Sequence, residues 1–395
     1  MKRLHLIISM VGIMFFSLQL ESCIEPPLNL PGQEVLVDMP LVETELSVVW
    51  NVEADWTTGW YYGWDETDEA IWGGMGYNMP TSYQVRRYYL GDYPDAPHTT
   101  VDAFSIRGTS FRRFFSFGYY DILFWSDIDS KDGTQVLVIN ESLDEVTATT
   151  TGNRGMSRNV RQLIDNKEYD ITTGIYGLRN QPEIFYAAYP ENIFISRNLS
   201  DYIYDPVENI YIKKIETELR PLVYIYLVQI ILLNNDGRIK GINGNTAMSS
   251  MASGTNVNTG HTNNNPSIIY FNTRLKRNLT VEGTPCDIIG GKFTTFGLCD
   301  MDPYTRAGKI YNGSRGDLKN HLFFDLVFSN DGEKTYAVDV TDQCQSQAHG
   351  GVITVIIDCG NLEPPVGPEE PEKGQGSLFV PTVEDYDEVY WEVEL

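Results

Sequence analysis

Short runs of alternating apolar and polar residues, separated by tight-turn signals, constrain the fold of this 395-residue chain more than any other feature. Asp-Gly pairs at 132–133, 236–237 and 331–332 each stand between two strand-like runs. Asp-Gly supplies the positive φ angles that hairpin turns require, so each pair predicts a hairpin. Helical periodicity is scarce, and residues 157–166 are the best short helix candidate. This pattern predicts an all-β protein built of antiparallel sandwiches.

Two central segments carry opposite signals. Residues 222–233 form a long, nearly unbroken apolar run, which predicts a strand buried on both faces and is too short for a transmembrane helix. Residues 241–266 are small and rich in Asn, and we expect a long loop there, with a brief helical turn around residues 247–254.

The length of the chain allows two domains with full cores. A new series of strands begins after residues 196–206, which predicts a first sandwich over residues 35–200 and a second over residues 201–360. Residues 361–376 are rich in Pro, Glu and Gly and predict an extended linker.

A tail of residues 377–395 follows this linker. At its end, alternate apolar positions predict a strand with one apolar face, which needs a partner sheet. These positions are Val389, Trp391, Val393 and Leu395.

The beginning of the chain resembles a lipoprotein export signal. A cationic start precedes an apolar run over residues 6–18, which is too short for a permanent membrane span, and Cys23 closes the segment. We expect residues 1–22 to be removed and Cys23 to carry palmitate or similar acyl chains that hold the protein on the outer membrane. An ordinary secretory signal with an incidental cysteine is the alternative. Residues 23–34 contain several prolines and predict a tether.

The formal net charge of −25 excludes some partners. Nucleic acid would be repelled, and no basic stripe offsets the repulsion. Anionic lipid headgroups would be repelled as well, so we expect membrane contact to come from the lipid of Cys23 alone.

The chain contains no recognisable motif for catalysis, for a metal or for a cofactor. The spacing of Cys286, Cys299, Cys344 and Cys359 matches no zinc motif, and their pairing stays open. The acidic group Asp65, Glu66, Asp68 and Glu69 could hold a glycosidase acid/base pair, but a solvated acidic surface is the favoured interpretation. We interpret residues 127–133 as a β-turn rather than a calcium loop, and the Arg-Gly-Asp tripeptide at 315–317 as a chance match.

A cluster of aromatic residues marks the region after residue 50. Trp56, Trp60, Trp64 and Trp72 stand beside carboxylates, and exposed aromatic rings in such a setting stack on sugars. This is the basis of an alternative function, glycan binding. Packing into the core and edge of the first sandwich is the favoured interpretation, because large aromatic side chains are usually mostly buried.

Six stretches in order resemble the fimbrillin-like lipoproteins of Bacteroidetes, especially the anchor-type relatives of the minor fimbrium. The stretches are Phe117–Trp125, Leu219–Tyr224, Gly241–Gly254, Phe293–Leu298, Val338–Asp342 and Val383–Val389. The resemblance implies two tandem transthyretin-like β-sandwiches and a non-enzymatic role in surface pili or adhesion.

In that family a missing strand of one subunit is supplied by its neighbour, which is strand addition to an open groove. Stalk subunits of the family lose their first strand to an Arg-specific protease. No Arg occurs here between Cys23 and Val85, so we expect the first strand to stay. The resemblance then implies a membrane-held anchor or accessory subunit, whose partners are other fimbrial subunits and a possible glycan or host-surface ligand. The tail is either donated to a neighbour or folded back onto its own sheet.

Overall fold

The computed structural model describes residues 41–48, 59–94, 96–97, 99–126, 136–139, 143–152, 177–302 and 318–365. Several predictions fall outside these residues and stay predictions. They concern the export signal, Cys23, the tether, Trp56, residues 127–133, 157–166 and 315–317, most of the linker, and the tail with Val389, Trp391, Val393 and Leu395.

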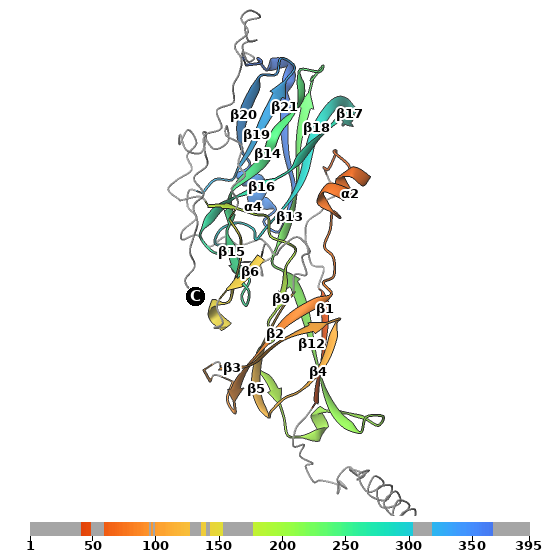
Figure 1. Cartoon of the computed structure of the whole chain (residues 1–395), viewed down its shortest axis with the longest axis vertical. Coiled ribbons are helices and arrows are strands. Elements are labelled where there is room, and N and C mark those ends of the chain that lie inside the picture. The colour runs from red at the N-terminus through yellow and green to blue at the C-terminus, as the bar shows by residue number, and fades with distance from the viewer. Residues whose placement is uncertain are drawn as a thin grey trace, which may run out of the picture.

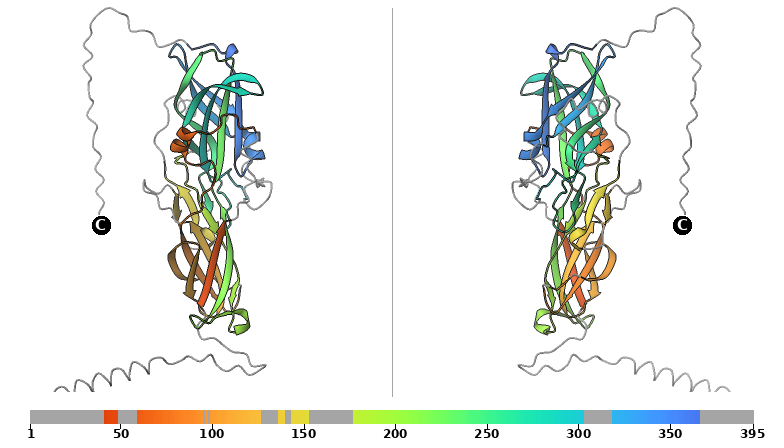
Figure 2. Two further views of the ribbon diagram at one scale, coloured as in Figure 1. Left: turned by 90° about the vertical axis from the view of Figure 1, so that its right-hand side faces the viewer. Right: turned by 90° about the vertical axis from the view of Figure 1, so that its left-hand side faces the viewer.

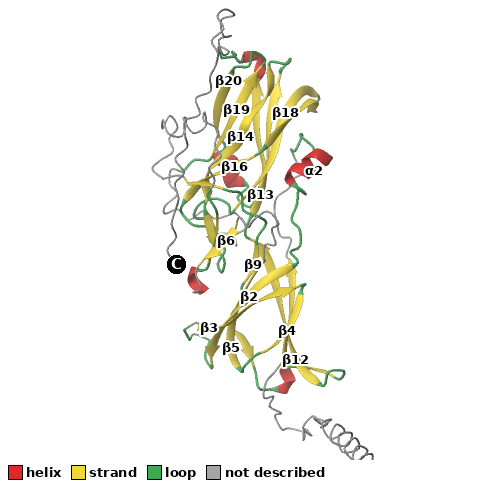
Figure 3. Cartoon of the chain, in the orientation of Figure 1, coloured by secondary structure: helices red, strands yellow, loops and turns green. Residues whose placement is uncertain are grey.

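Strands dominate the described residues, as Figures 1 and 3 show, and the all-β prediction is confirmed. The first module is one nine-stranded sheet in the order β3-β2-β5-β9-β12-β1-β4, with β10 on β5 and β11 on β12. Its two end strands, β3 and β4, contact each other, so the sheet curls around its own core. The strands are β1 (Leu41–Val48), β2 (Ser82–Gly91), β3 (Thr99–Arg107), β4 (Ser110–Phe114), β5 (Gly118–Ser126), β9 (Tyr186–Ala188), β10 (Ile193–Ile195), β11 (Ile203–Asp205) and β12 (Ile210–Pro221).

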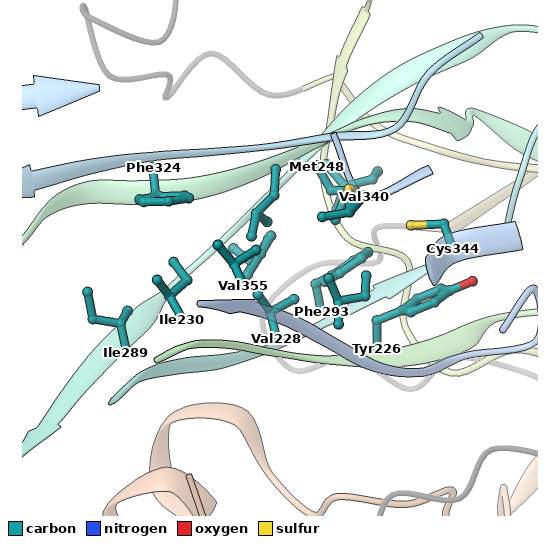
Figure 4. Packing of buried hydrophobic residues seen from close by; sticks show 14 of the residues in the cluster. Tyr226, Val228, Ile230, Met248, Ile289, Phe293, Phe324, Val340, Cys344 and Val355 are labelled. Carbon is teal, nitrogen blue, oxygen red and sulfur yellow. The ribbon is translucent and has the colours of Figure 1, made fainter. Parts of the chain in front are cut away.

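The second module is a sandwich of a four-stranded sheet, β17-β18-β13-β21, and a five-stranded sheet, β20-β19-β14-β16-β8. Apolar side chains of both sheets meet between them, such as Val228 and Val355 from one sheet and Phe324 from the other (Figure 4). The strands are β8 (Gly177–Arg179), β13 (Tyr224–Leu233), β14 (Ile239–Ala252), β16 (Pro266–Phe271), β17 (Thr273–Val281), β18 (Thr284–Thr295), β19 (His321–Phe328), β20 (Glu333–Asp339) and β21 (Gly351–Asp358).

A small sheet in the order β15-β7-β6 and a third apolar cluster lie between the two modules. The cluster joins Leu123 and Trp125 of β5 to Phe296 and Cys299 of the second module. The remaining elements are short: β6 (Val136–Ile139), β7 (Thr147–Thr150), β15 (Gly254–Asn256), α2 (Glu66–Trp72), α4 (Thr341–Ser346), η1 (Leu143–Glu145), η2 (Leu199–Asp201) and η3 (Cys359–Asn361). Within the part of the chain that the structure describes, no helix has the length and apolar character to cross a bilayer.

The long apolar run is the strand β13, which lies between β18 and β21 and is buried on both faces, as predicted. The turn at 331–332 joins the paired strands β19 and β20 and is a hairpin, as predicted. At 236–237 both residues have positive φ, but the hairpin prediction is wrong. The turn leads from β13 in one sheet to β14 in the other, so the two strands do not pair.

The loop predicted for residues 241–266 is wrong for residues 241–252, and the helical turn predicted around residues 247–254 is wrong as well, whereas residues 257–265 do form a loop. Residues 239–252 form β14, which pairs with β16 and β19 through several register shifts. Its small polar side chains are buried and hydrogen-bonded; the hydroxyl of Ser250, for example, donates to the carbonyl of Lys319 at 2.7 Å. Small polar residues are therefore compatible with an inner strand here, because each has a partner.

The predicted boundary between residues 200 and 201 does not match the strand pairing. β11 and β12 pair with the strands of the first module, so sheet membership changes between Pro221 and Tyr224. Conversely, β8 belongs to the second module, because it pairs with β16, although it precedes β9 of the first module in the sequence. The transthyretin-like topology stays an implication of the resemblance.

Candidate functional site

Residues 59–77 lead across the outer face of the four-stranded sheet of the second module and end at Tyr77, in the core of the first module. We term this segment the clasp. It follows β1 in the sequence, so the chain crosses from the first module to the second and returns through β2 (Figures 1 and 2). Tyr62 of the clasp packs with Ile231 of β13 and with Cys286 and Ile288 of β18. The clasp therefore ties the segment after β1 to the second module.

A glycine and a buried glutamine of the sheet receive the clasp. The ring of Tyr62 lies directly over Gly290, where an added Cβ would be only 2.4 Å from the ring. The side chain of Gln229 accepts from the backbone N–H groups of Tyr61 and Tyr62 at 2.9 and 3.3 Å, and donates to the carbonyl of Gly59. Glycine inside a strand often marks such a close approach.

A cluster of charges completes the contact. Asp68 is fully buried, and its carboxylate accepts from Arg274 at 2.8 Å and from Lys276 at 2.5 Å. Both cations also pair with Asp65, whose side chain caps the first turn of α2. The hydroxyl of Tyr62 donates to Asp68 at 3.1 Å. The buried carboxylate thus has two cations and a hydroxyl as partners, which offsets its desolvation.

The titration of this cluster follows from its contacts. The hydrogen bond from Lys276 is the main cause that holds the pKa of Asp65 well below its usual range. Burial, reinforced by the charge of Asp68, raises the pKa of Tyr62. At neutral pH Asp65 is therefore ionised and Tyr62 is protonated.

These contacts decide between the interpretations of the acidic group. Asp65 and Asp68 are occupied by the same two cations, and Glu69 accepts from the indole N–H of Trp64. The pair of carboxyls across an open cleft that a glycosidase needs is not formed by these residues. The expected solvated surface describes the exposed Glu66 but is wrong for Asp68.

Three of the described tryptophans, all from the aromatic cluster after residue 50, belong to the clasp. Trp60, Trp64 and Trp72 are all half-buried, the rings of Trp64 and Trp72 lie 5.4 Å apart, and the indole of Trp60 donates to the carbonyl of Gly63. The expectation that they fill the core of the first sandwich is wrong, because they pack on the second module. They also do not form an exposed platform for a sugar, so the glycan hypothesis loses the support of these three residues.

The four late cysteines are buried, in three separate clusters. Cys344 and Cys359 lie in the core of the second module, Cys299 between the modules and Cys286 beneath the clasp. Among the described residues, no group of three or more His, Cys, Asp or Glu side chains is arranged to hold a metal ion.

β1 occupies an interior position in the first module. It runs parallel to β12, from the pair of Leu41 with Ile212 onward, and antiparallel to β4 on its other side. Val42 is fully buried in the core of the curled sheet. The chain's own first strand therefore fills an interior position of this sheet.

β21 is an edge strand, and two glutamine side chains cover part of its free edge. Gln343 accepts from the N–H of Thr354 at 2.8 Å and donates to its carbonyl at 3.0 Å. Gln347 makes the same two contacts with Val352, at 2.8 and 3.0 Å. We term these two side chains the edge cap. Each carboxamide takes the place of a peptide group in a neighbouring strand, and a covered edge resists unwanted pairing.

A polar cleft of about 1290 Å³ separates β12 and the end of β9 from the loop after β15. Carboxylates, amides and a guanidinium line it, and such groups hydrogen-bond hydroxyl-rich ligands. Among its lining residues are Tyr189, Glu191, Glu216, Glu218, Arg220, Asn256 and His261. No sequence pattern indicated this cleft, because its lining residues come from distant segments.

No family model matches the sequence, and no curated protein matches it. Among solved structures, the fold is similar to that of a protein described as an adhesin from Bacteroides ovatus, with a TM-score of 0.45, 12% identity and coverage of 84% of this chain and 94% of that one. It is also similar to a protein described as polysaccharide-binding from Bacteroides thetaiotaomicron, with a TM-score of 0.40, 9% identity and coverage of 81% and 91%. The fimbrial anchor protein Mfa2 from Porphyromonas gingivalis is similar with a TM-score of 0.35, 10% identity and coverage of 80% and 90%.

Proposed function

We propose that this chain is a non-enzymatic lipoprotein of the cell surface that serves as an anchor or accessory subunit of a fimbria. The observation that carries the proposal is the position of β1, which fills an interior place between β12 and β4. β1 also follows Cys23 closely in the sequence, so a lipid on Cys23 would be joined directly to a strand inside the first module. A subunit that keeps this strand accepts no donor there and ends a polymer.

The absence of arginine between Cys23 and Val85 supports the retention of β1. An Arg-specific protease has no target there, and the next arginine, Arg86, lies within the inner strand β2. We propose that the tail, with Val389, Trp391, Val393 and Leu395, supplies the strand for the neighbouring subunit; folding back onto its own sheet is the other arrangement of the same strand.

Treatment of the folded protein with an Arg-specific protease tests the retention of β1. The wild-type chain is expected to keep residues 41–48, whereas Asn51→Arg is expected to release them and to let a synthetic β1 peptide bind in their place. Asn51→Lys is the matched control, since it adds the same charge without a target. Release of β1 from the wild-type chain would refute the anchor proposal.

Purification from native cells tests the two ends of the chain. Cys23→Ser should abolish incorporation of labelled palmitate, whereas Ser22→Ala should leave it unchanged. Deletion of residues 377–395 should abolish co-purification of fimbrial polymer. Unchanged co-purification would refute strand donation by the tail.

Glycan binding is the second candidate function, and the polar cleft now favours it in place of the tryptophans. Substitution of Glu216 and Glu218 by Ala should then remove signals on a glycan array, and substitution of Trp60 and Trp64 should leave them unchanged. An array without any signal from the wild-type protein would refute this candidate.

A further inference from the structure

Six of the ten large hydrophobic side chains that are exposed in the described residues lie at one end of the first module. We term this group the apolar tip. Its exposed fractions run from 39% for Tyr204 to 91% for Val207. Its members are Tyr93, Phe114, Phe194, Ile203, Tyr204 and Val207.

Strand pairing places the apolar tip at the end where β1 begins. Leu41, the first residue of β1, lies between Phe114 of β4 and Ile212 of β12, and Ile203 pairs with the same Ile212. Phe194 of β10 pairs with Tyr119 at the start of β5. The last residue of β2 pairs with the same Tyr119, and Tyr93 follows β2 in the sequence. In Figure 1 this is the lower end of the molecule, opposite β20 and β21.

The most exposed member of the tip is held by a well-built turn. The side chain of Asp205 accepts from the backbone N–H groups of Val207 and Glu208 at 2.8 and 3.3 Å. Asn209 adopts a positive φ of 54° and accepts from the hydroxyl of Tyr204 at 2.6 Å. The projection of Val207 into solvent is therefore fixed by the hairpin between β11 and β12.

Several charges beside the tip have partners within the protein. Arg112 pairs with Glu208 at 2.8 Å and with Glu43 at 3.7 Å. Lys213 donates to the carbonyl of Phe194, and burial lowers the pKa of this lysine. Paired charges cost less to bring against an apolar phase than isolated ones.

We propose that the apolar tip docks on the bilayer that holds the lipid of Cys23, so that the protein contacts the membrane through side chains as well as lipid. This inference rests on the lipid anchor of the proposed function. Residues 24–40 reach at most about 60 Å when extended and about 25 Å as a relaxed coil, so they keep the start of β1 close to the membrane. Tyrosine is enriched at the membrane interface, and aromatic and aliphatic side chains bind there by burying apolar area. This proposal differs from the expectation that the lipid alone provides membrane contact, because it adds contact through the side chains of the tip.

Fluorescence of the lipidated full chain on vesicles of phosphatidylethanolamine and phosphatidylglycerol (3:1) tests the docking. An environment-sensitive dye is attached through Val207→Cys, and through Ile356→Cys in the second module as the matched control, which is 62% exposed. The natural cysteines 286, 299, 344 and 359 are buried, so the dye is directed to the introduced thiol. The dye at 207 should shift to the blue and be quenched by lipids with labelled acyl chains, and the dye at 356 should do neither.

A second measurement removes the lipid. In the Cys23→Ser protein, substitution of Ile203 and Val207 by Ser should lower partitioning into the same vesicles about tenfold. Two aliphatic side chains that become partly buried in the membrane contribute about 1.4 kcal/mol, which corresponds to this factor. The control pair, Ile71→Ser on the clasp with Met79→Ser just after it, lies outside the tip and should leave partitioning unchanged.

The outcomes separate the two proposals. A protein that floats with vesicles while the dye at 207 stays in water would overturn the docking and leave the lipid anchor intact. A native protein without acyl chains whose tip still binds vesicles would overturn the anchor and support the docking. Protection of the dye at 207 only after fimbrial polymer is added would identify the tip as a protein interface and overturn the proposal.

Discussion

β1 and β21 both run parallel to a neighbour in modules whose strands otherwise pair mostly antiparallel, but their free sides are closed in different ways. β1 has a second strand, β4, on its other side, whereas β21 has two glutamine side chains. A strand closes a sheet along its whole length, and a pair of side chains closes only the residues they reach. The difference indicates that the first module needs β1 to complete its core, whereas in the second module the two glutamines only cover the free edge of β21.

The largest expected effect comes from breaking the inner strand. Val42→Asp places a carboxylate in the core of the first module and should lower the free energy of unfolding by about 4 kcal/mol, because a buried charge without a partner is costly. Glu43→Gln, the next residue of the strand, should change it by less than about 0.5 kcal/mol, since its ion pair is partly exposed. Chemical denaturation measures both. Equal effects of the two variants would contradict an interior β1.

The clasp links the first module, which contains β1, to the second module, which contains β21. The next test is a substitution of its buried carboxylate, Asp68. Asp68→Ala leaves Lys276 and Arg274 with only Asp65 and should cost about 3 kcal/mol. Exposed Glu66, two residues earlier, is the control, and Glu66→Ala should be nearly neutral. Proteolysis of the segment around residues 59–77 should accelerate in the first variant alone; an equally protected segment would show that the charges do not hold the clasp.

The glycine beneath Tyr62 tests the fit of the clasp without a change of charge. Gly290→Ala places a methyl group against the ring and should cost about 2 kcal/mol, as overpacked sites do. Gly241→Ala in β14 meets no atom within 4 Å and should be neutral or slightly stabilising. Thermal unfolding of the two variants makes the comparison, and a neutral Gly290→Ala would contradict the close contact.

The smallest effect on stability is expected at the edge cap. Gln343→Leu with Gln347→Leu removes the partners of two residues of β21 and should cost about 1–2 kcal/mol, since the freed peptide groups are reached by water. The exposed edge should also let molecules associate, which light scattering detects as dimers or larger species. Gln345→Leu, on the exposed side of α4, is the control. A monomeric double variant would show that the edge stays closed without its cap.

The sequence predicted the features that depend on local pattern, and missed those that depend on pairing between distant segments. β13 was predictable because its run is apolar throughout, and the turn at 331–332 because its residues adopt the required angles. β17 was missed because its charged residues, Arg274 and Lys276, face the carboxylates of the clasp rather than solvent. The residues of β14 were mistaken for a loop, since a small polar side chain shows its buried partner only in the fold.

Two signals could have indicated the clasp from the sequence alone. Gln229 is the one polar residue within the apolar run of β13, and Gly290 stands beside a second glycine in the middle of β18. A buried amide needs partners, and a glycine in a strand invites a close neighbour. Together they predict a segment on the outer face of this sheet, but they do not identify which segment.

The parallel pairing of β1 also has a mechanical consequence. Tension on the chain upstream of Leu41 acts along the axis of β1, whose eight residues pair with β12 and whose first five also pair with β4. When the load pulls a strand lengthwise, these bonds are sheared together instead of being unzipped one after another. In the anchor role proposed above, a cell that drags against a fixed fimbria would therefore load the joint in its strongest direction.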